Sequence, residues 1–191
     1  MEPIKSVALK DERGCDHMSS LKQAIETLHT HIPTPQEGLG DEAFHMVSRL
    51  TPLVNVDLLI KNENRDILLT WRADEFYGPG WHIPGGILRF KETFETRIQA
   101  VAQLELRTTV KHDNTPCMIQ QTINPTRDTR GHFISLLFDC ELSSPLSESH
   151  KFTLDNPMND QWAWHSVIPD NFIEVQREIY GAIFNAEATT T

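Results

Sequence analysis

Residues 91–106 constrain the fold most strongly, because their apolar side chains repeat with the period of an α-helix. Phe94, Ile98 and Val101 occupy positions i, i+4 and i+7, so they share one face that should pack against a core. The next position of this series is Glu105, which lies within about 20° of Phe94 around the helix axis. A carboxylate there costs free energy unless a metal ion, an arginine or hydrogen-bond donors compensate it. The alternative is a frayed last turn in which Glu105 faces water.

A tight turn with two glycines directly precedes this helix. In the segment Trp81-His-Ile-Pro-Gly-Gly-Ile87, Gly85 and Gly86 let the backbone approach a ligand closely. Glu92 and Glu95 stand at the start of the helix, where a carboxylate either complements the helix dipole or belongs to a site. Pro-Gly-Gly alone is only a turn signal, but its position before an acidic helix indicates a ligand site.

The rest of the pattern predicts an α+β fold. Residues 53–60 are predicted to form a strand, and residues 67–71 the returning strand of a hairpin across a polar turn. Further strands are expected at 117–123, 132–141 and 161–166, with a closing helix at about 169–184. This order predicts a mixed β-sheet sandwiched between α-helices.

The N-terminal segment differs from the rest of the chain. Residues 1–40 are predicted to form an N-terminal helical extension, in which a helix carries Leu21 to Leu28 and ends before Pro33. Residues 41–191 are predicted to form the main domain, which opens with a short helix near Asp41. Such helices pack either on a partner subunit or on their own chain, and the sequence leaves both open.

Composition excludes several classes of function. The 191 residues hold 27 acidic and 17 basic side chains, so a formal charge of −10 argues against nucleic-acid binding but permits a phosphorylated ligand bridged by a divalent cation. No apolar run approaches the length that spans a membrane, so no membrane partner is expected. Cys15, Cys117 and Cys140 form no C-x-x-C pair, and the start lacks a signal peptide, so we expect a cytoplasmic protein with free thiols.

The glycine turn and the helix together resemble the Nudix hydrolases, whose box reads G-x5-E-x7-R-E-U-x-E-E-x-G-U, with U aliphatic. Gly86 and Glu92 fit the opening G-x5-E, and Glu105 fits the second residue of the Glu-Glu pair. The box is degenerate here, and its other polar and glycine positions hold Ala100, Val101, Leu104 and Arg107.

The flanking residues resemble one branch of that superfamily, the GDP-mannose mannosyl hydrolases, over about residues 41–184. This resemblance implies the Nudix fold and a homodimer. The matching features are Asp41-Glu-Ala-Phe44, Arg49-Leu-Thr-Pro-Leu-Val54, Asp57, Asn62-Glu-Asn64, Leu68-Leu69, Arg72, Gly80-Trp81, Pro84-Gly-Gly86, Glu92-Thr93 and Glu105-Leu106.

The resemblance also implies a metal site. In that branch Mg²⁺, or Mn²⁺ in its place, binds the first glycine carbonyl of the turn and the retained box glutamate, which here are Gly85 and Glu105. We add Glu92, the other glutamate of the box, as a candidate ligand. The ion would neutralise the diphosphate and stabilise GDP as the leaving group, which gives Glu105 a catalytic role.

The same resemblance assigns contacts to the substrate. Asp57 matches the aspartate that holds the sugar, although it could instead lie on the solvent face of a hairpin. Arg72 matches an arginine that contacts the diphosphate in catalysis, although it could be a surface charge. Ile87 replaces another family arginine, and Arg89 is a candidate substitute. Trp81 offers a ring on which a base could stack, with Trp71 and Tyr77 beside it, although such residues also form cores.

The general base of the branch has no counterpart. Alignment on Trp164 places neutral Asn159 at the histidine position, and Asn cannot accept a proton from water. Nearby candidates are His150, Asp155, Asp160 and His165.

Three functions are therefore weighed. The sequence favours a metal-dependent hydrolase of a nucleoside-diphosphate sugar of the GDP-mannose or GDP-glucose type, in which water attacks the anomeric carbon and releases GDP and free sugar. The alternatives are a Nudix-fold nucleotide-binding or regulatory module that has lost catalysis, and a structural domain without a nucleotide ligand.

Overall fold

The computed structural model describes residues 16–74, 76–153 and 156–185, which form two compact units. The first unit ends at Leu39 and contains α1 (Asp16–His31), the helix expected around Leu21 to Leu28. Cys15 and Asp155 lie outside the described residues. Among the helices of the described ranges, none has both the length and the apolarity needed to cross a membrane.

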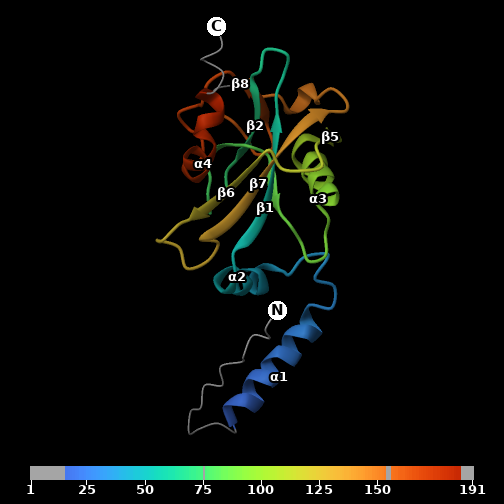
Figure 1. The fold of residues 1–191 in the computed structure, drawn as a ribbon, viewed down its shortest axis with the longest axis vertical. Coiled ribbons are helices and arrows are strands. Elements are labelled where there is room, and N and C mark those ends of the chain that lie inside the picture. The colour runs from blue at the N-terminus through green and yellow to red at the C-terminus, as the bar shows by residue number, and fades with distance from the viewer. Residues whose placement is uncertain (1–15, 75, 154–155, 186–191) are drawn as a thin grey trace, which may run out of the picture. The chain divides into compact units, whose positions relative to one another are not determined.

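The second unit begins at Gly40 and is built on a mixed five-stranded sheet (Figure 1). Strands β1 and β7 run parallel along eight paired positions, whereas β4, β5 and β6 pair antiparallel with one or the other. Covered by neighbours on both edges, β1 is buried along most of its length. The strands are β1 (Leu53–Ile60), β4 (Gly85–Ile87), β5 (Val110–His112), β6 (Met118–Ile123) and β7 (His132–Leu142).

A second, three-stranded sheet has the order β3 (Gly80–His82), β2 (Ile67–Arg72) and β8 (Trp162–His165). The prediction that residues 53–60 and 67–71 pair as a hairpin is therefore wrong. Both strands exist, but β4 and β7 occupy the two edges of β1, so β2 joins β3 and β8 instead. A single bridge between Lys61 and Ile67 joins the two sheets at the turn.

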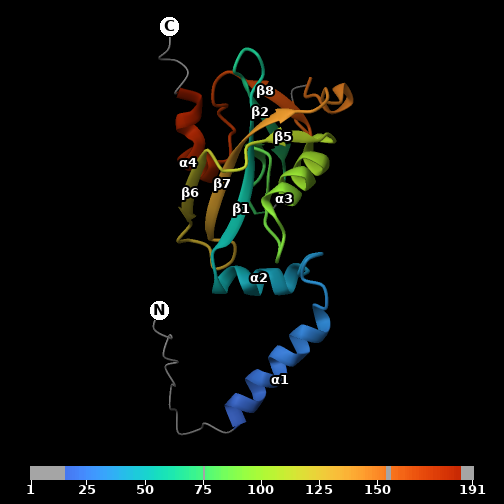
Figure 2. The same cartoon turned by 45° about the vertical axis from the view of Figure 1, so that its right-hand side comes forward.

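Two helices enclose the strands from opposite sides (Figure 2). Helix α3 (Phe94–Val101) continues as a π-helical turn, Ala102–Leu106, and buries Ile98 and Val101 in a core cluster with Val56 and Phe138. Helix α4 (Glu174–Asn185) buries Tyr180 against a second cluster that includes Leu137. The predicted α+β arrangement, a mixed sheet between helices, is confirmed.

A short helix, α2 (Asp41–Leu50), opens the second unit as the sequence predicted. Its Ser48 is buried, and the Ser48 hydroxyl accepts a hydrogen bond from the backbone N–H of Arg130 at 3.1 Å. This bond attaches the loop between β6 and β7 to α2.

Candidate active site

Glu105 lies inward from the π-helical turn that follows α3, as the apolar stripe predicted. Its carboxylate is mostly buried; Oε2 lies 2.7 Å from Thr70 Oγ1 on β2, and Oε1 accepts the Gly85 N–H at 3.2 Å. Hydrogen-bond donors therefore compensate its burial in this structure. Burial raises the pKa of Glu105 to about 7, although the bonds from Thr70 and Gly85 oppose the rise.

A buried histidine completes this hydrogen-bond chain. His82 Nδ1 lies 2.9 Å from the Ile83 carbonyl oxygen, which only accepts, so Nδ1 carries the ring proton. Its Nε2 lies 3.2 Å from Thr70 Oγ1 and 3.5 Å from Glu105 Oε2. Burial, together with the Arg72 charge, lowers the pKa of His82 to about 3, so the ring is neutral and its Nε2 is an acceptor.

Thr70 has one hydroxyl proton and two acceptors beside it. If Glu105 is ionised, the Thr70 hydroxyl donates to the carboxylate and His82 Nε2 receives no proton from it. If Glu105 is protonated, it donates to Thr70 Oγ1, which donates to His82 Nε2, and every group is satisfied. The acceptor at His82 Nε2 therefore favours the protonated form of Glu105, whereas the Gly85 N–H favours the ionised form.

Asp57 is buried in the middle of β1, so the solvent-face alternative is wrong. Tyr180 of α4 donates its hydroxyl proton to Asp57 Oδ2 at 2.6 Å, and Asn55 Nδ2 donates to Oδ1 at 2.6 Å. Burial raises the pKa of Asp57 to about 6 against these bonds. Its negative charge also contributes to the raised pKa of Glu105, so the two carboxylates affect each other.

Gly85 separates the two carboxylates and has to be a glycine. A Cβ atom at this position would lie 2.0 Å from Asp57 Oδ1. Leu58 N–H donates to the Pro84 carbonyl, and Leu88 N–H donates to the Val54 carbonyl. Gly85 and Asp57 thus face each other between these bonds, and the N–H and C=O of Gly85 both point away from β1. Both groups therefore point to the side of β4 on which Glu105 lies, and the Gly85 N–H donates to its carboxylate.

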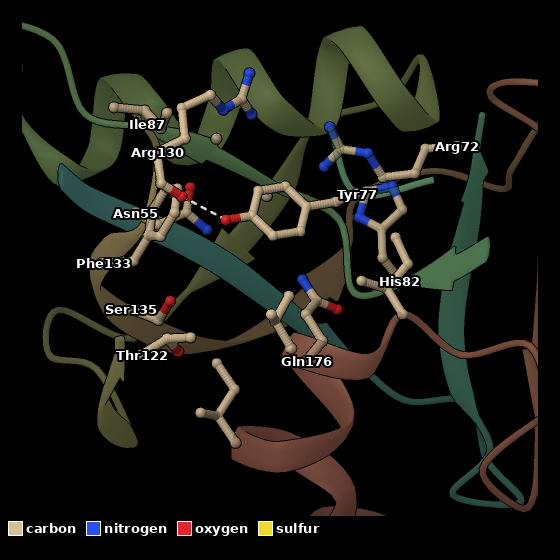
Figure 3. A pocket seen from close by; sticks show the side chains of 15 residues that line it. Asn55, Arg72, Tyr77, His82, Ile87, Thr122, Arg130, Phe133, Ser135 and Gln176 are labelled. Carbon is tan, nitrogen blue, oxygen red and sulfur yellow. Dashed lines mark hydrogen bonds between the residues drawn. The ribbon is translucent and has the colours of Figure 1, made fainter. Parts of the chain in front are cut away.

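A cavity of about 190 Å³ opens beside this turn (Figure 3). Arg72 reaches it from the end of β2, where its side chain is half-buried and Nε and Nη2 both contact Asp74 Oδ2. The cavity is lined by Asn55, Arg72, Tyr77, His82, Gly85, Gly86, Ile87, Thr122, Arg130, Phe133, Ser135, Ile173, Val175, Gln176 and Ile179.

Three predicted site residues lie elsewhere. Both oxygens of Glu92 are bound by the Arg97 guanidinium, at 2.8 and 2.9 Å, and Glu92 also accepts the backbone N–H of Arg89. Glu92 therefore stabilises the entry to α3, and the side chain of Arg89 is exposed to solvent. Trp81 is 3% exposed and packs on Trp71 at 5.4 Å between ring centroids, so it has no free face for a base.

None of the described residues of the loop before β8 lines the cavity, so none of them is placed there as a general base. Asn159 Oδ1 accepts the Ala73 N–H at 2.6 Å, and Asp160 lies 4.0 Å from Arg107 in an exposed pair. His165 packs against Trp81, and its pKa is lowered by burial. Within the described ranges, no three His, Cys, Asp or Glu side chains converge as a metal cluster.

Sequence reasoning missed Arg130, Thr122, Ser135 and Gln176 as cavity residues. The alternation of β6 gives a signal for Thr122, which is buried between exposed Gln121 and Ile123. Arg130 lies in a loop with φ of 54°, where no periodicity applies, so only the tertiary structure identifies it.

Comparison with solved structures identifies the class of this α+β fold. It is the Nudix fold, as the sequence predicted. The MutT protein from Methanosarcina mazei Go1 matches with a TM-score of 0.51 and 18% identity, over 73% of this chain and 98% of that one. A MutT Nudix hydrolase from Burkholderia pseudomallei matches with a TM-score of 0.52 and 18% identity, over 67% of this chain and 95% of that one. A UDP-X diphosphatase matches with a TM-score of 0.50 and 15% identity, over 87% of this chain and 89% of that one. No family model matches the sequence.

Proposed function

We propose that this protein is a metal-dependent hydrolase of a nucleoside-diphosphate sugar, of the GDP-mannose or GDP-glucose type, that releases GDP and free sugar. The observation that carries the proposal is the convergence of Glu105 and Asp57 on Gly85, at the wall of a cavity that Arg72 also lines. Carboxylates beside a cationic pocket suit a substrate whose phosphates need a bridging cation.

The residues around Gly85 fit a Mg²⁺ or Mn²⁺ ion that keeps most of its shell for water and phosphate oxygens. Mg²⁺ is commonly held by one or two carboxylates rather than by an all-protein cage. Glu105 and the Gly85 carbonyl would hold it, and Asp57 adds negative charge nearby. When bound, the ion supplies charge neutralisation at the diphosphate. The raised pKa values of Asp57 and Glu105 indicate a pair that a cation would stabilise.

The chain's own groups would orient the substrate. His82 and Thr70 fix the carboxylate of Glu105, and Tyr180 and Asn55 fix that of Asp57. The cavity, about 190 Å³, is smaller than the roughly 300 Å³ at which pockets for whole small-molecule ligands begin. It would therefore enclose one part of a nucleotide sugar and leave the remainder at its mouth.

The test is product analysis with GDP-mannose, GDP-glucose and UDP-glucose in the presence of Mg²⁺. We expect GDP and free hexose, with oxygen from ¹⁸O-labelled water in the sugar. Formation of GMP and a hexose 1-phosphate would instead mean attack on phosphorus. A control with Glu105→Gln separates this activity from a contaminating hydrolase.

A second candidate is a nucleotide-binding module without turnover. The observation that favours it is Asn159, whose neutral side chain stands at the position of the expected base and is engaged with Ala73. A nucleotide sugar that raises the melting temperature but is never consumed would support this candidate. If a nucleotide sugar produces no thermal shift and no turnover, a structural domain without a nucleotide ligand is the remaining candidate. The proposed homodimer is tested separately by light scattering of the full chain.

A further inference from the structure

Two polar atoms of the cavity wall lack partners, and both belong to residues outside the Gly85–Glu105 region. Thr122 Oγ1 and Arg130 Nε are buried without a hydrogen-bond partner among the described residues. Thr122 is itself 8% exposed. Buried polar groups are nearly always satisfied in folded proteins, so two orphaned groups lining one cavity indicate a polar ligand.

The guanidinium of Arg130 is held in place by aromatic rings. Its Cζ lies 4.4 Å from the ring centroid of Phe76, 5.5 Å from that of Phe44 and 5.9 Å from that of Tyr77. Its backbone is fixed as well, since Ser48 accepts its N–H and its carbonyl accepts the Tyr77 hydroxyl proton (Figure 3). Little side-chain freedom remains to be lost when a ligand binds.

Arg130 also differs from the other arginine of the cavity in its charge balance. Arg72 is paired with Asp74, whereas Arg130 forms no ion pair with a carboxylate among the described residues. Burial lowers the pKa of Arg130, and the Arg72 charge adds to this effect, whereas the nearby Asp74 charge opposes it without forming an ion pair with Arg130. An anionic ligand would supply the missing counter-charge.

We propose that Arg130 binds a phosphate of the substrate diphosphate and that Thr122 hydrogen-bonds a hydroxyl group of the sugar. Thr122 and Ser135 are diagonal neighbours on one face of the β6–β7 pair, and Ser135 hydrogen-bonds the buried Asp57. The polar groups of β6, β7 and β1 thus form one wall of the cavity, with Arg130 above them in the β6–β7 loop. This inference rests on the proposed function, because it takes this cavity as the site of a nucleoside-diphosphate sugar.

The first test measures binding of inorganic pyrophosphate in EDTA by calorimetry, which isolates the arginines from any metal. We expect Arg130→Met to weaken binding about tenfold or more, and Arg130→Lys to retain most of it. The matched control is Arg127→Met, because Arg127 lies in the same β6–β7 loop as Arg130 but does not line the cavity. Its guanidinium lies 4.5 Å from the ring centroid of Tyr77 and donates to the Phe76 carbonyl. We expect this control to bind within about twofold of the wild type.

The second test uses Thr122→Val, which keeps the side-chain shape and removes the hydroxyl group. We expect unchanged affinity for pyrophosphate and about tenfold weaker binding of GDP-mannose, also in EDTA. Melting curves of each variant confirm that it is folded.

Several outcomes would overturn the inference: no pyrophosphate binding by the wild type, equal losses in Arg130→Met and Arg127→Met, or equal losses of both ligands in Thr122→Val. These results are distinguishable from failure of the proposed function. Binding effects as expected without any hydrolysis would refute the hydrolase alone, whereas hydrolysis with unchanged affinities in the variants would refute the Arg130 and Thr122 assignment alone.

Discussion

The hydroxyl group of Thr70 and the carboxylate of Glu105 lie 2.7 Å apart, although 35 positions separate the two residues in the chain. This contact joins the second sheet to the turn that follows α3. Because the same hydroxyl also lies beside neutral His82, the protonation state of Glu105 determines whether Thr70 can donate a hydrogen bond to His82 Nε2.

Glu105→Gln should abolish hydrolysis while the fold survives. The amide keeps the volume of the side chain and removes a buried charge whose pKa is raised to about 7. We therefore expect the metal-free variant to be as stable as the wild type or more stable at pH 8, by urea unfolding. Undiminished turnover by this variant would exclude a role for Glu105 in the reaction.

The contribution of Glu105 to stability without metal should fall as the pH rises from about 4.5 to 7. Glu105 has a pKa of about 7 in the folded protein and an ordinary pKa of 4.5 in the unfolded chain, so the folded state binds the proton more tightly. Its contribution is full below about 4.5 and is lost as the pH passes 7, with a total of roughly 3 kcal/mol. Urea unfolding in EDTA at pH 5, 6, 7 and 8 measures this contribution as the difference between the wild type and Glu105→Gln, because Asp57 and His82 titrate in both proteins.

Mg²⁺ binding should strengthen over the same interval, because the ion competes with the proton on Glu105. The measurement is the Mg²⁺-dependent rise in melting temperature at pH 6 and pH 8. Affinity that does not change with pH would place the ion away from Glu105.

Glu92→Gln should lower stability and leave Mg²⁺ affinity unchanged. Glu92 and Arg97 form a mostly buried pair at 2.8 Å, and removing one charge leaves the Arg97 guanidinium without its partner. Thermal unfolding and metal titration of the same variant separate the two effects. A loss of Mg²⁺ affinity comparable to that of Glu105→Gln would restore Glu92 as a ligand.

Gly85→Ala should destabilise the protein strongly, because the new Cβ would lie 2.0 Å from Asp57 Oδ1, and Asn55 and Tyr180 hold that carboxylate in place. The matched control is Gly181→Ala in α4, where the Cβ meets only Ile168 Cδ1 at 3.8 Å. There we expect stabilisation of about 0.5–1 kcal/mol from helix propensity. Similar melting temperatures for the two variants would contradict the close approach at Gly85.

The sequence alone determined those features that depend on local periodicity. The spacing of Phe94, Ile98 and Val101 was sufficient to predict a helix with an inward-facing Glu105, although Phe94 itself is exposed. The run of strands and helices was sufficient to predict the α+β fold. Pro84-Gly-Gly marked the turn that meets this carboxylate. These inferences hold because helix and strand periods are properties of neighbouring residues.

Only the tertiary structure decided which strands pair and which side chains share the cavity. The pairing of β1 with β7 rather than with β2 depends on which partners cover its edges, and no local pattern records this. Glu92 and Trp81 were predicted to belong to the site, but Glu92 pairs with Arg97 and Trp81 lies in the core. Arg130 reaches the cavity through a loop fixed by Ser48, Tyr77 and Phe76, contacts between segments that are far apart in the chain.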